Sequence, residues 1–81
     1  MTPITSPSSL GNVLQHYRKS LNLTQNSVSQ QHYIRQASIS SLENGSPGMS
    51  IDTLFRLMTA LGLEMQLVPR KDYQDDKAAW E

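Results

Sequence analysis

The chain has 81 residues and seven side chains each of basic and acidic type, so its formal net charge is zero. A domain of this size buries only about 60% of its unfolded surface, which makes its stability marginal and favours oligomerisation. The chain contains no cysteine, which excludes disulfides and thiolate metal sites. No apolar run approaches the roughly 20 residues of a membrane span, and the first residues lack the pattern of a secretory signal. We therefore expect a cytoplasmic protein with no membrane partner.

The charges are unevenly distributed along the chain. Residues 1–63 hold four basic and two acidic side chains, a net of +2, whereas residues 64–81 hold three basic and five acidic, a net of −2. A charge of +2 attracts a polyanion only weakly. Nucleic-acid binding by this chain would therefore depend on dimerisation and on neutral hydrogen bonds to phosphate as much as on charge.

The first helix is predicted to begin at Pro7. Ser6 is a suitable N-cap, and proline is favoured at the first helical position. Residues 1–6 are expected to form a flexible arm, and Asn22 suits the left-handed conformation that ends a helix. An apolar stripe with helical spacing lies between these ends. It consists of Leu10, Val13, Leu14, Tyr17 and Leu21.

Two short helices are expected within residues 23–45, at about 24–31 and 35–44. Thr24 is the predicted N-cap of the first, and Gly45 ends the second. Their outward-facing residues are mostly serine and glutamine, which form hydrogen bonds but carry no charge. This surface suits a helix that lies against a polar partner. The seam between the two helices is expected to be formed by Val28 and His32, four residues apart in the first, and by Ile39 and Leu42, three apart in the second.

A fourth helix is expected to begin after its N-cap, Ser50, and to end at Gly62. Asp52 is favourably placed in the positive first turn of this helix. The spacing of the apolar residues predicts one buried face. That face consists of Ile51, Leu54, Leu57, Met58 and Leu61.

Residues 63–69 change to the two-residue period of a half-buried strand. A single strand leaves its backbone hydrogen-bonding groups unpaired, and pairing with the same strand of a second copy would satisfy them. We therefore predict a homodimer with an intersubunit sheet. Residues 70–81 are expected to be a flexible tail, in which Trp80 is a candidate anchor for a partner protein. The predicted dimerisation residues are Leu63, Met65 and Leu67.

The segments LTQ at 23–25 and ISSLENG at 39–45 resemble the helix-turn-helix of the phage-repressor (Cro/cI, XRE) class, over about residues 8–62. Within that class, the strand after the fourth helix, the RQA at 35–37 and the polar tail are most similar to HipB-type antitoxins, which bind DNA and HipA-type kinase toxins. The resemblance implies an all-α, lambda-repressor-like bundle of about four helices. Residues 7–62 would form its DNA-binding domain.

The resemblance also implies which side chains meet DNA. Gln25, at the start of the second helix, would bind a phosphate oxygen. In the major groove, Arg35 suits guanine and Gln36 suits adenine, while Ala37 leaves space for a thymine methyl. Ser38 would also lie near the base edges, and Ser41 and Asn44 would position the DNA backbone. The full set is Gln25, Arg35, Gln36, Ala37, Ser38, Ser41 and Asn44.

One structural ion pair is implied as well, since Glu43 resembles the family glutamate that pairs with an arginine of the first helix, here Arg18. The sequence departs from the family pattern around the turn. Ser29 replaces the usual alanine at the helix crossing, and His32 and Tyr33 replace the leucine and glycine before the third helix. Tyr33 must either adopt a positive φ or use a different turn.

These observations predict a sequence-specific repressor that binds double-stranded DNA at a palindromic operator, represses its own toxin–antitoxin operon and joins a HipA-like Ser/Thr kinase toxin. Whether it neutralises that toxin directly is left open. Two alternatives also stay open: a stand-alone repressor of the same class without a toxin, and an interaction module that does not use DNA. The sequence has no glycine-rich phosphate loop, metal-spaced cluster or nucleophile–base set, so we expect no enzyme, catalytic residue, metal or cofactor.

Overall fold

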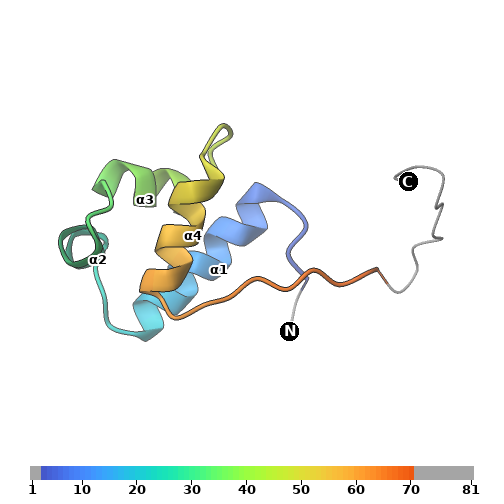
Figure 1. The fold of residues 1–81 in the computed structure, drawn as a ribbon, viewed down its shortest axis with the longest axis horizontal. Helices are drawn as coiled ribbons and strands as arrows, with labels where there is room; N and C mark the ends of the chain where they lie inside the picture. The colour runs from blue at the N-terminus through green and yellow to red at the C-terminus, as the bar shows by residue number, and fades with distance from the viewer. Residues whose placement is uncertain (1–2, 71–81) are drawn as a thin grey trace.

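Four helices pack around one small core in the computed structural model, which describes residues 3–70 (Figure 1). They are α1 (Pro7–Ser20), α2 (Gln25–His32), α3 (Gln36–Glu43) and α4 (Ile51–Ala60). α3 packs against each of the other three helices, and α2 also contacts α4. The expectation of an all-α bundle of about four helices is confirmed. None of these helices is long and apolar enough to cross a membrane.

Side-chain caps begin three of the four helices, as the sequence predicts. Each cap accepts the amide hydrogen of the third helical residue at 3.0–3.1 Å. In α1 and α2 that third residue is a serine whose hydroxyl in turn accepts the amide of the cap, which makes the capping reciprocal. The caps are Ser6 for α1, Thr24 for α2 and Ser50 for α4. α3 begins after Arg35 and has no side-chain cap.

Residues in the left-handed conformation follow the ends of the helices. Asn22 follows α1 with φ 58°, as predicted, and Gly45 follows α3 with φ 69°. Tyr33, at the turn between α2 and α3, has φ 56° and ψ 41°. The turn therefore keeps the geometry that glycine favours, and the tyrosine adopts it at a cost of about 1–2 kcal/mol. Tyr33 is 89% exposed, so its ring returns little of that energy by packing.

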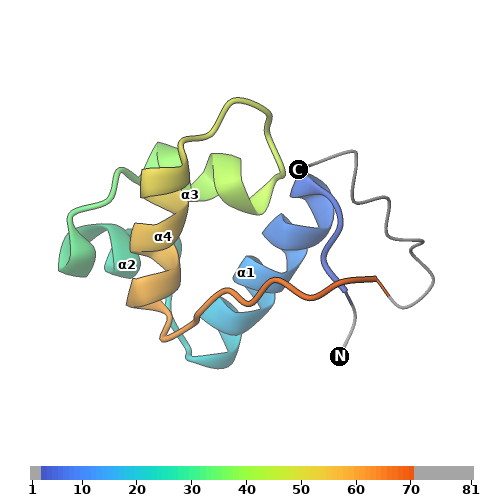
Figure 2. The same ribbon diagram turned by 45° about the vertical axis from the view of Figure 1, so that its right-hand side comes forward.

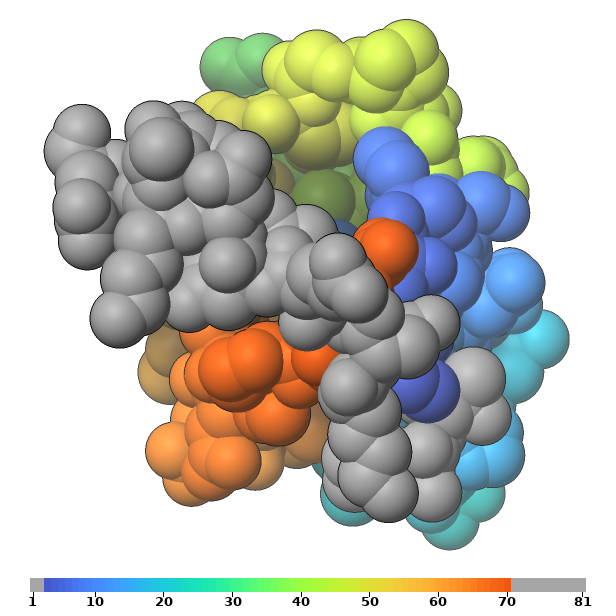
Figure 3. Space-filling view, turned by 90° about the vertical axis from the view of Figure 1, so that its right-hand side faces the viewer, coloured from blue at the N-terminus to red at the C-terminus, as the bar shows by residue number. Residues whose placement is uncertain are grey.

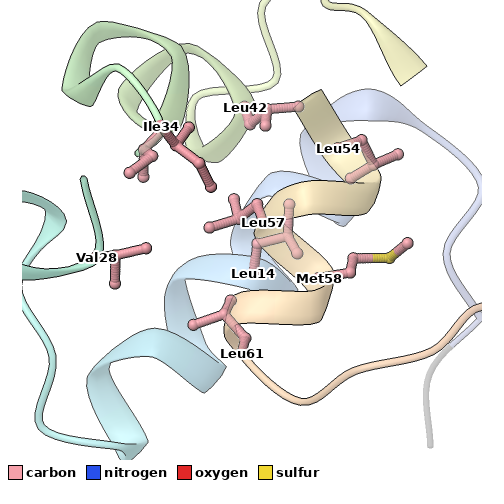
Figure 4. Close-up of a cluster of buried hydrophobic side chains, with 9 residues drawn as sticks. Leu14, Val28, Ile34, Leu42, Leu54, Leu57, Met58 and Leu61 are labelled. Carbon is pink, nitrogen blue, oxygen red and sulfur yellow. The ribbon is translucent and has the colours of Figure 1, made fainter. Parts of the chain in front are cut away.

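One cluster of nine buried aliphatic side chains forms the core (Figure 4). Each helix contributes to it, together with a residue of the turn between α2 and α3. Leu14 of α1 and Leu57 of α4 lie near its middle in Figure 4 and are at most 1% exposed. Of the predicted seam between α2 and α3, Val28, Ile39 and Leu42 are part of this core, but the prediction for His32 is wrong, because the last residue of α2 is exposed. The nine residues are Leu14, Val28, Ile34, Ile39, Leu42, Leu54, Leu57, Met58 and Leu61.

Three residues of the predicted apolar stripes are exposed. Tyr17 and Leu21 of α1 are 38% and 49% exposed, and Ile51 of α4 is 65% exposed. α3 packs on the side of α1 that carries Gly11 and Arg18, both of which are buried. Tyr17 lies on another side of α1 and is therefore exposed. Ile51 lies in the first turn of α4 and borders a surface groove instead.

Residues 63–70 follow α4 without a regular hydrogen-bonded structure. Figures 1 and 2 show this segment running past α1 towards the N-terminal arm, and Figure 3 shows it on the same face as the start of α1. A strand needs a neighbouring strand, and the described residues of one chain provide none. Pairing through Leu63, Met65 and Leu67 therefore stays a prediction. Of the predicted tail, residues 71–81, including Trp80, lie outside the described residues.

Gly11 sits where α1 crosses the end of α3. A Cβ atom at this position would lie 2.4 Å from the carbonyl oxygen of Glu43 and 2.6 Å from that of Leu42. Both contacts are with backbone, which cannot rotate away as a long side chain would. The absence of a side chain at Gly11 therefore sets how closely the two helices approach.

Replacing Gly11 with alanine is expected to destabilise the protein. The overpacking costs about 1–3 kcal/mol, which exceeds the gain of up to about 1 kcal/mol in helix propensity. Urea denaturation measures the change in the free energy of unfolding. The matched control is Asn12→Ala, at an exposed position of the same helix, which is expected to be neutral or stabilising. Equal stability of the two variants would contradict the close approach of α1 to α3.

Candidate nucleic-acid interface

The outer face of α3 is uncharged and, apart from Ala37, polar. Ile39, Leu42 and Glu43 point inward, and the helical period of 100° per residue places a second set on the opposite face. In that set Asn44 Nδ2 donates a hydrogen bond to Ser40 Oγ at 3.4 Å. Ser40 lies on the serine-rich outward face that the sequence predicts, but it was not among the predicted DNA contacts, although its four-residue spacing from Asn44 marks both as members of one face. The outward residues are Ala37, Ser40, Ser41 and Asn44.

The N-terminal end of α3 carries the exposed side chains of Arg35, Gln36 and Ala37. No side chain caps this helix; the Ser38 amide donates instead to the carbonyl oxygen of Arg35 at 3.0 Å, and the amides of Gln36 and Ala37 have no side-chain acceptor. A helix N-terminus with free amides favours hydrogen-bond acceptors and negative charge. Within residues 3–70, Arg35 takes part in no ion pair. These features lie together at the end of the helix that the sequence analysis placed nearest to base edges.

Ser38 lies to one side of the outer face, in an open polar recess between α3 and α4. Across the recess, Arg56 Nε pairs with Asp52 Oδ2 at 3.1 Å, and both side chains are more than 60% exposed. Such an exposed pair contributes little to stability. Sequence reasoning did not find the α4 residues of the recess, because only the fold brings them beside α3. The lining residues are Tyr33, Ile34, Arg35, Ser38, Asp52, Thr53 and Arg56.

Gln25 is the first residue of α2 and is half-buried. Its Nε2 donates a hydrogen bond to Glu43 Oε1 at 3.0 Å. A glutamine amide has two hydrogens, so this bond leaves the second for another acceptor. The structure thus places Gln25 in a link between α2 and α3, a role that the sequence analysis did not predict.

Arg18 and Glu43, which the sequence analysis paired, form a buried two-point ion pair. Arg18 Nε donates to Glu43 Oε2 at 2.6 Å, and Nη2 donates to Oε1 at 3.0 Å. Arg18 Nη1 also donates to the carbonyl oxygen of Leu23 at 2.7 Å. Both side chains are at most 8% exposed. Together with Gln25, this pair connects α1, α2 and α3 through one carboxylate.

The surroundings of Glu43 have opposing effects on its pKa. Burial raises the pKa, but hydrogen bonds from Arg18 and Gln25 and the nearby positive charges outweigh burial, so the pKa of Glu43 lies below its ordinary value. The hydrogen bond to Glu43 likewise raises the pKa of Arg18, against the opposing effect of burial. Both groups are therefore held in their charged forms.

Among residues 3–70, no three His, Cys, Asp or Glu side chains gather into a group that could hold a metal ion. The predicted DNA-contacting residues are not all equivalent in the structure. Most lie on or beside the outer face of α3, whereas Ser38 turns towards α4 and Gln25 binds Glu43.

Comparisons with known proteins match both the sequence and the fold. The helix-turn-helix family matches residues 14–68. The antitoxin HipB of Escherichia coli O6:H1 (strain CFT073) is 32% identical over 75 residues, which cover 93% of this chain and 80% of that protein. The antitoxin HipB of Escherichia coli K12 is 32% identical over 69 residues, covering 85% of this chain and 78% of that protein.

Two solved structures extend the similarity to three dimensions. The HipA–HipB–O2–O3 complex contains a chain with a TM-score of 0.81 and 31% identity, covering 88% of this chain and 100% of that chain. The HipB–O4 20mer complex contains a chain with the same TM-score, identity and coverage. The superposition spans most of the chain, so the likeness extends beyond the two short helices around the turn.

Replacing Glu43 with glutamine is expected to destabilise the protein by about 3–5 kcal/mol, because it leaves Arg18 buried without a counter-charge. The loss should also depend on pH. Since the folded-state pKa of Glu43 lies below its ordinary value of 4.5, the carboxylate contributes fully above that value, and its contribution is lost as pH falls through the folded-state pKa.

Urea denaturation from neutral pH down to acid measures both effects. The wild type is expected to lose stability on acidification more steeply than Glu43→Gln, which lacks this titrating group. The matched control is Asp52→Asn, which breaks the exposed pair with Arg56 and is expected to cost less than about 1 kcal/mol. A Glu43→Gln variant no less stable than this control would show that the buried pair does not stabilise the fold.

Proposed function

Since this chain belongs to the helix-turn-helix family, in the group of the HipB antitoxins, we propose that it is a sequence-specific repressor that binds double-stranded DNA and represses its own toxin–antitoxin operon. The single observation that carries the proposal is the TM-score of 0.81, at 31% identity, to HipB in the HipB–O4 20mer complex. A repressor acts where the bacterial chromosome lies, so we propose the cytoplasm as its location.

The shape and chemistry of α3 support DNA as the ligand. An α-helix fits the major groove, where each base pair presents donors and acceptors. Arg35 and Gln36 lie at the uncapped end of α3, and Asn44 lies along its outer face. We assign Arg35 and Gln36 to base edges, Ala37 to a thymine methyl, and the polar residues further along the helix to the DNA backbone. The latter are Ser41 and Asn44.

We assign two further DNA contacts, one to Gln25 and one to Ser38. The second amide hydrogen of Gln25 is free for a phosphate oxygen, since the first binds Glu43. Ser38 approaches DNA from the side, together with the α4 residues of the polar recess. Uncharged hydrogen bonds of this kind fit the small positive charge of the domain, because they hold phosphate without an ion pair.

We propose that the protein binds a palindromic operator as a homodimer. Two copies double the weak positive charge, and two-fold symmetry in the protein matches two half-sites in DNA. In this arrangement residues 1–6 are an arm, 7–62 the DNA-binding domain, 63–69 the dimerisation strand and 70–81 a tail. The strand residues are Leu63, Met65 and Leu67.

The second proposed partner is a HipA-like Ser/Thr kinase toxin. The observation that favours it is the match to HipB in the HipA–HipB–O2–O3 complex, a structure that also contains HipA. Trp80 is the proposed anchor for such a partner, because a tryptophan side chain fills a pocket well. The alternatives are a repressor of the same class without a toxin and an interaction module that does not use DNA.

The DNA proposal is tested with the promoter region upstream of the protein's own gene, in gel-shift and fluorescence-anisotropy titrations. The wild type is expected to bind one palindrome there, with an affinity that falls as salt rises. Gln36→Ala is expected to weaken specific binding by about 1–3 kcal/mol, because it removes a base-edge contact. The matched control is Gln30→Ala on the exposed surface of α2, which is expected to bind as the wild type does.

Thermal unfolding of each variant separates lost contacts from lost folding. If the wild type shows no salt-dependent complex with any part of its own promoter, the interaction-module alternative replaces the DNA proposal. If Gln36→Ala and Gln30→Ala bind equally well, α3 is not the helix that reads the bases.

The kinase proposal is tested separately by co-expressing the chain with the reading frame next to its gene. A HipA-like kinase is expected to co-purify with the wild type and to be lost with Trp80→Ala, while DNA binding is unchanged. The matched control is Tyr73→Ala, which removes another aromatic residue of the same tail. The absence of a kinase-like neighbour, together with intact operator binding, would favour the stand-alone repressor.

A further inference from the structure

Tyr33, at the turn between α2 and α3, combines a strained backbone with a side chain that the fold hardly uses. Its φ of 56° and ψ of 41° lie in the left-handed region, where glycine has no steric clash but a tyrosine does. The side chain is 89% exposed, so packing against the rest of residues 3–70 offsets little of that strain. Strained residues of this kind cluster at functional sites, which makes Tyr33 a candidate for a role in binding.

The backbone of the turn is fixed by contacts that do not involve the side chain of Tyr33. The amides of Tyr33 and Ile34 both donate to the carbonyl oxygen of Ser29, the second at 3.3 Å. The Ile34 side chain is buried in the core. A glycine at position 33 would meet the same constraints without strain, so the fold does not require a tyrosine there.

The side chain of Tyr33 lies at the edge of the candidate DNA-binding surface. It lines the polar recess between α3 and α4 together with Arg35 and Ser38, and Arg35 directly precedes the first residue of α3. The charged side chains of the recess are Arg35, Arg56 and Asp52, two positive and one negative, which is a net of +1. A neutral hydroxyl donor beside an excess of positive charge suits an anionic oxygen, such as that of a phosphate.

We propose that Tyr33 contacts the DNA backbone, with its hydroxyl donating a hydrogen bond to a phosphate oxygen beside the start of α3. This inference rests on the proposed DNA binding and adds a contact that the family pattern lacks, since Tyr33 replaces the glycine of that pattern. Phosphate contacts carry no sequence information, so Tyr33 raises the affinity for every duplex alike. Because the donor is uncharged, the contact releases no counterion.

The first test compares Tyr33→Phe with the wild type on the operator and on an unrelated duplex, by fluorescence anisotropy at several salt concentrations. We expect both dissociation constants to rise by about fivefold, since a hydrogen bond to a charged group is lost. The slope of log affinity against log salt is expected to stay unchanged, because no charge is removed. A loss confined to the operator would contradict a phosphate contact. The matched control is Tyr17→Phe on α1, 38% exposed, which is expected to bind as the wild type does.

A second variant separates a contact with DNA from a role in the fold. Tyr33→Gly removes the strain together with the side chain, so we expect its midpoint of urea denaturation to be no lower than that of the wild type. Operator binding is expected to weaken by about tenfold, since both half-sites lose the contact. The matched control is Asn22→Gly, the same change at an exposed left-handed position after α1, which is expected to leave DNA binding unchanged.

The outcomes separate this inference from the proposed function. If Tyr33→Gly binds the operator as tightly as the wild type while Gln36→Ala does not, the Tyr33 contact is wrong and the proposed DNA binding stands. If Tyr33→Phe loses a co-purifying kinase but binds DNA normally, the side chain serves a protein partner and the phosphate contact is wrong. A wild type that forms no salt-dependent complex with DNA overturns both the inference and the proposed function.

Discussion

The buried ion pair between Arg18 and Glu43 fixes the position of α3 in the bundle. Charges inside a protein stabilise it only when nearly all their hydrogen bonds are satisfied. Here the guanidinium donates to Glu43 and to the carbonyl of Leu23, while the carboxylate also accepts from Gln25. A shift of α3 along α1 would leave a buried charge without its partner. The orientation of the polar outer face of α3 depends on this pair.

Features that depend on a few neighbouring residues were predictable from the sequence. Ser6 and Thr24 cap their helices because the hydroxyl and the amide that it accepts lie three residues apart. Asn22 adopts the left-handed conformation for an equally local reason. The exposure of Tyr17 and Ile51 was not predictable, because the buried side of each helix is decided by distant elements that pack on it. Even the pairing of Arg18 with Glu43 required a family resemblance, since 25 residues separate them.

The candidate interface likewise has features that depend on neighbouring residues and features that depend on residues distant in sequence. The outward position of Ala37 and Asn44 follows from the helical period and from the inward position of Ile39. The environment of Ser38 does not, because its recess is completed by Thr53 and other α4 residues that are distant in sequence. The hydrogen bond from Gln25 to Glu43 also joins residues that are distant in sequence. Sequence patterns thus identified the helix and its faces, while the neighbours of each side chain came only from the folded arrangement.

The uncapped start of α3 has a thermodynamic consequence. In the other three helices a cap side chain accepts the amide of the third residue, whereas in α3 that amide, of Ser38, donates to the carbonyl oxygen of Arg35 at 3.0 Å. The two amides before it in α3, those of Gln36 and Ala37, are completed by water or by a bound molecule. Anything that supplies acceptors there binds the folded form alone and raises its stability through mass action, in proportion to the logarithm of its concentration. The first turn of α3 is therefore expected to become more ordered as more of the molecules carry a ligand on this surface.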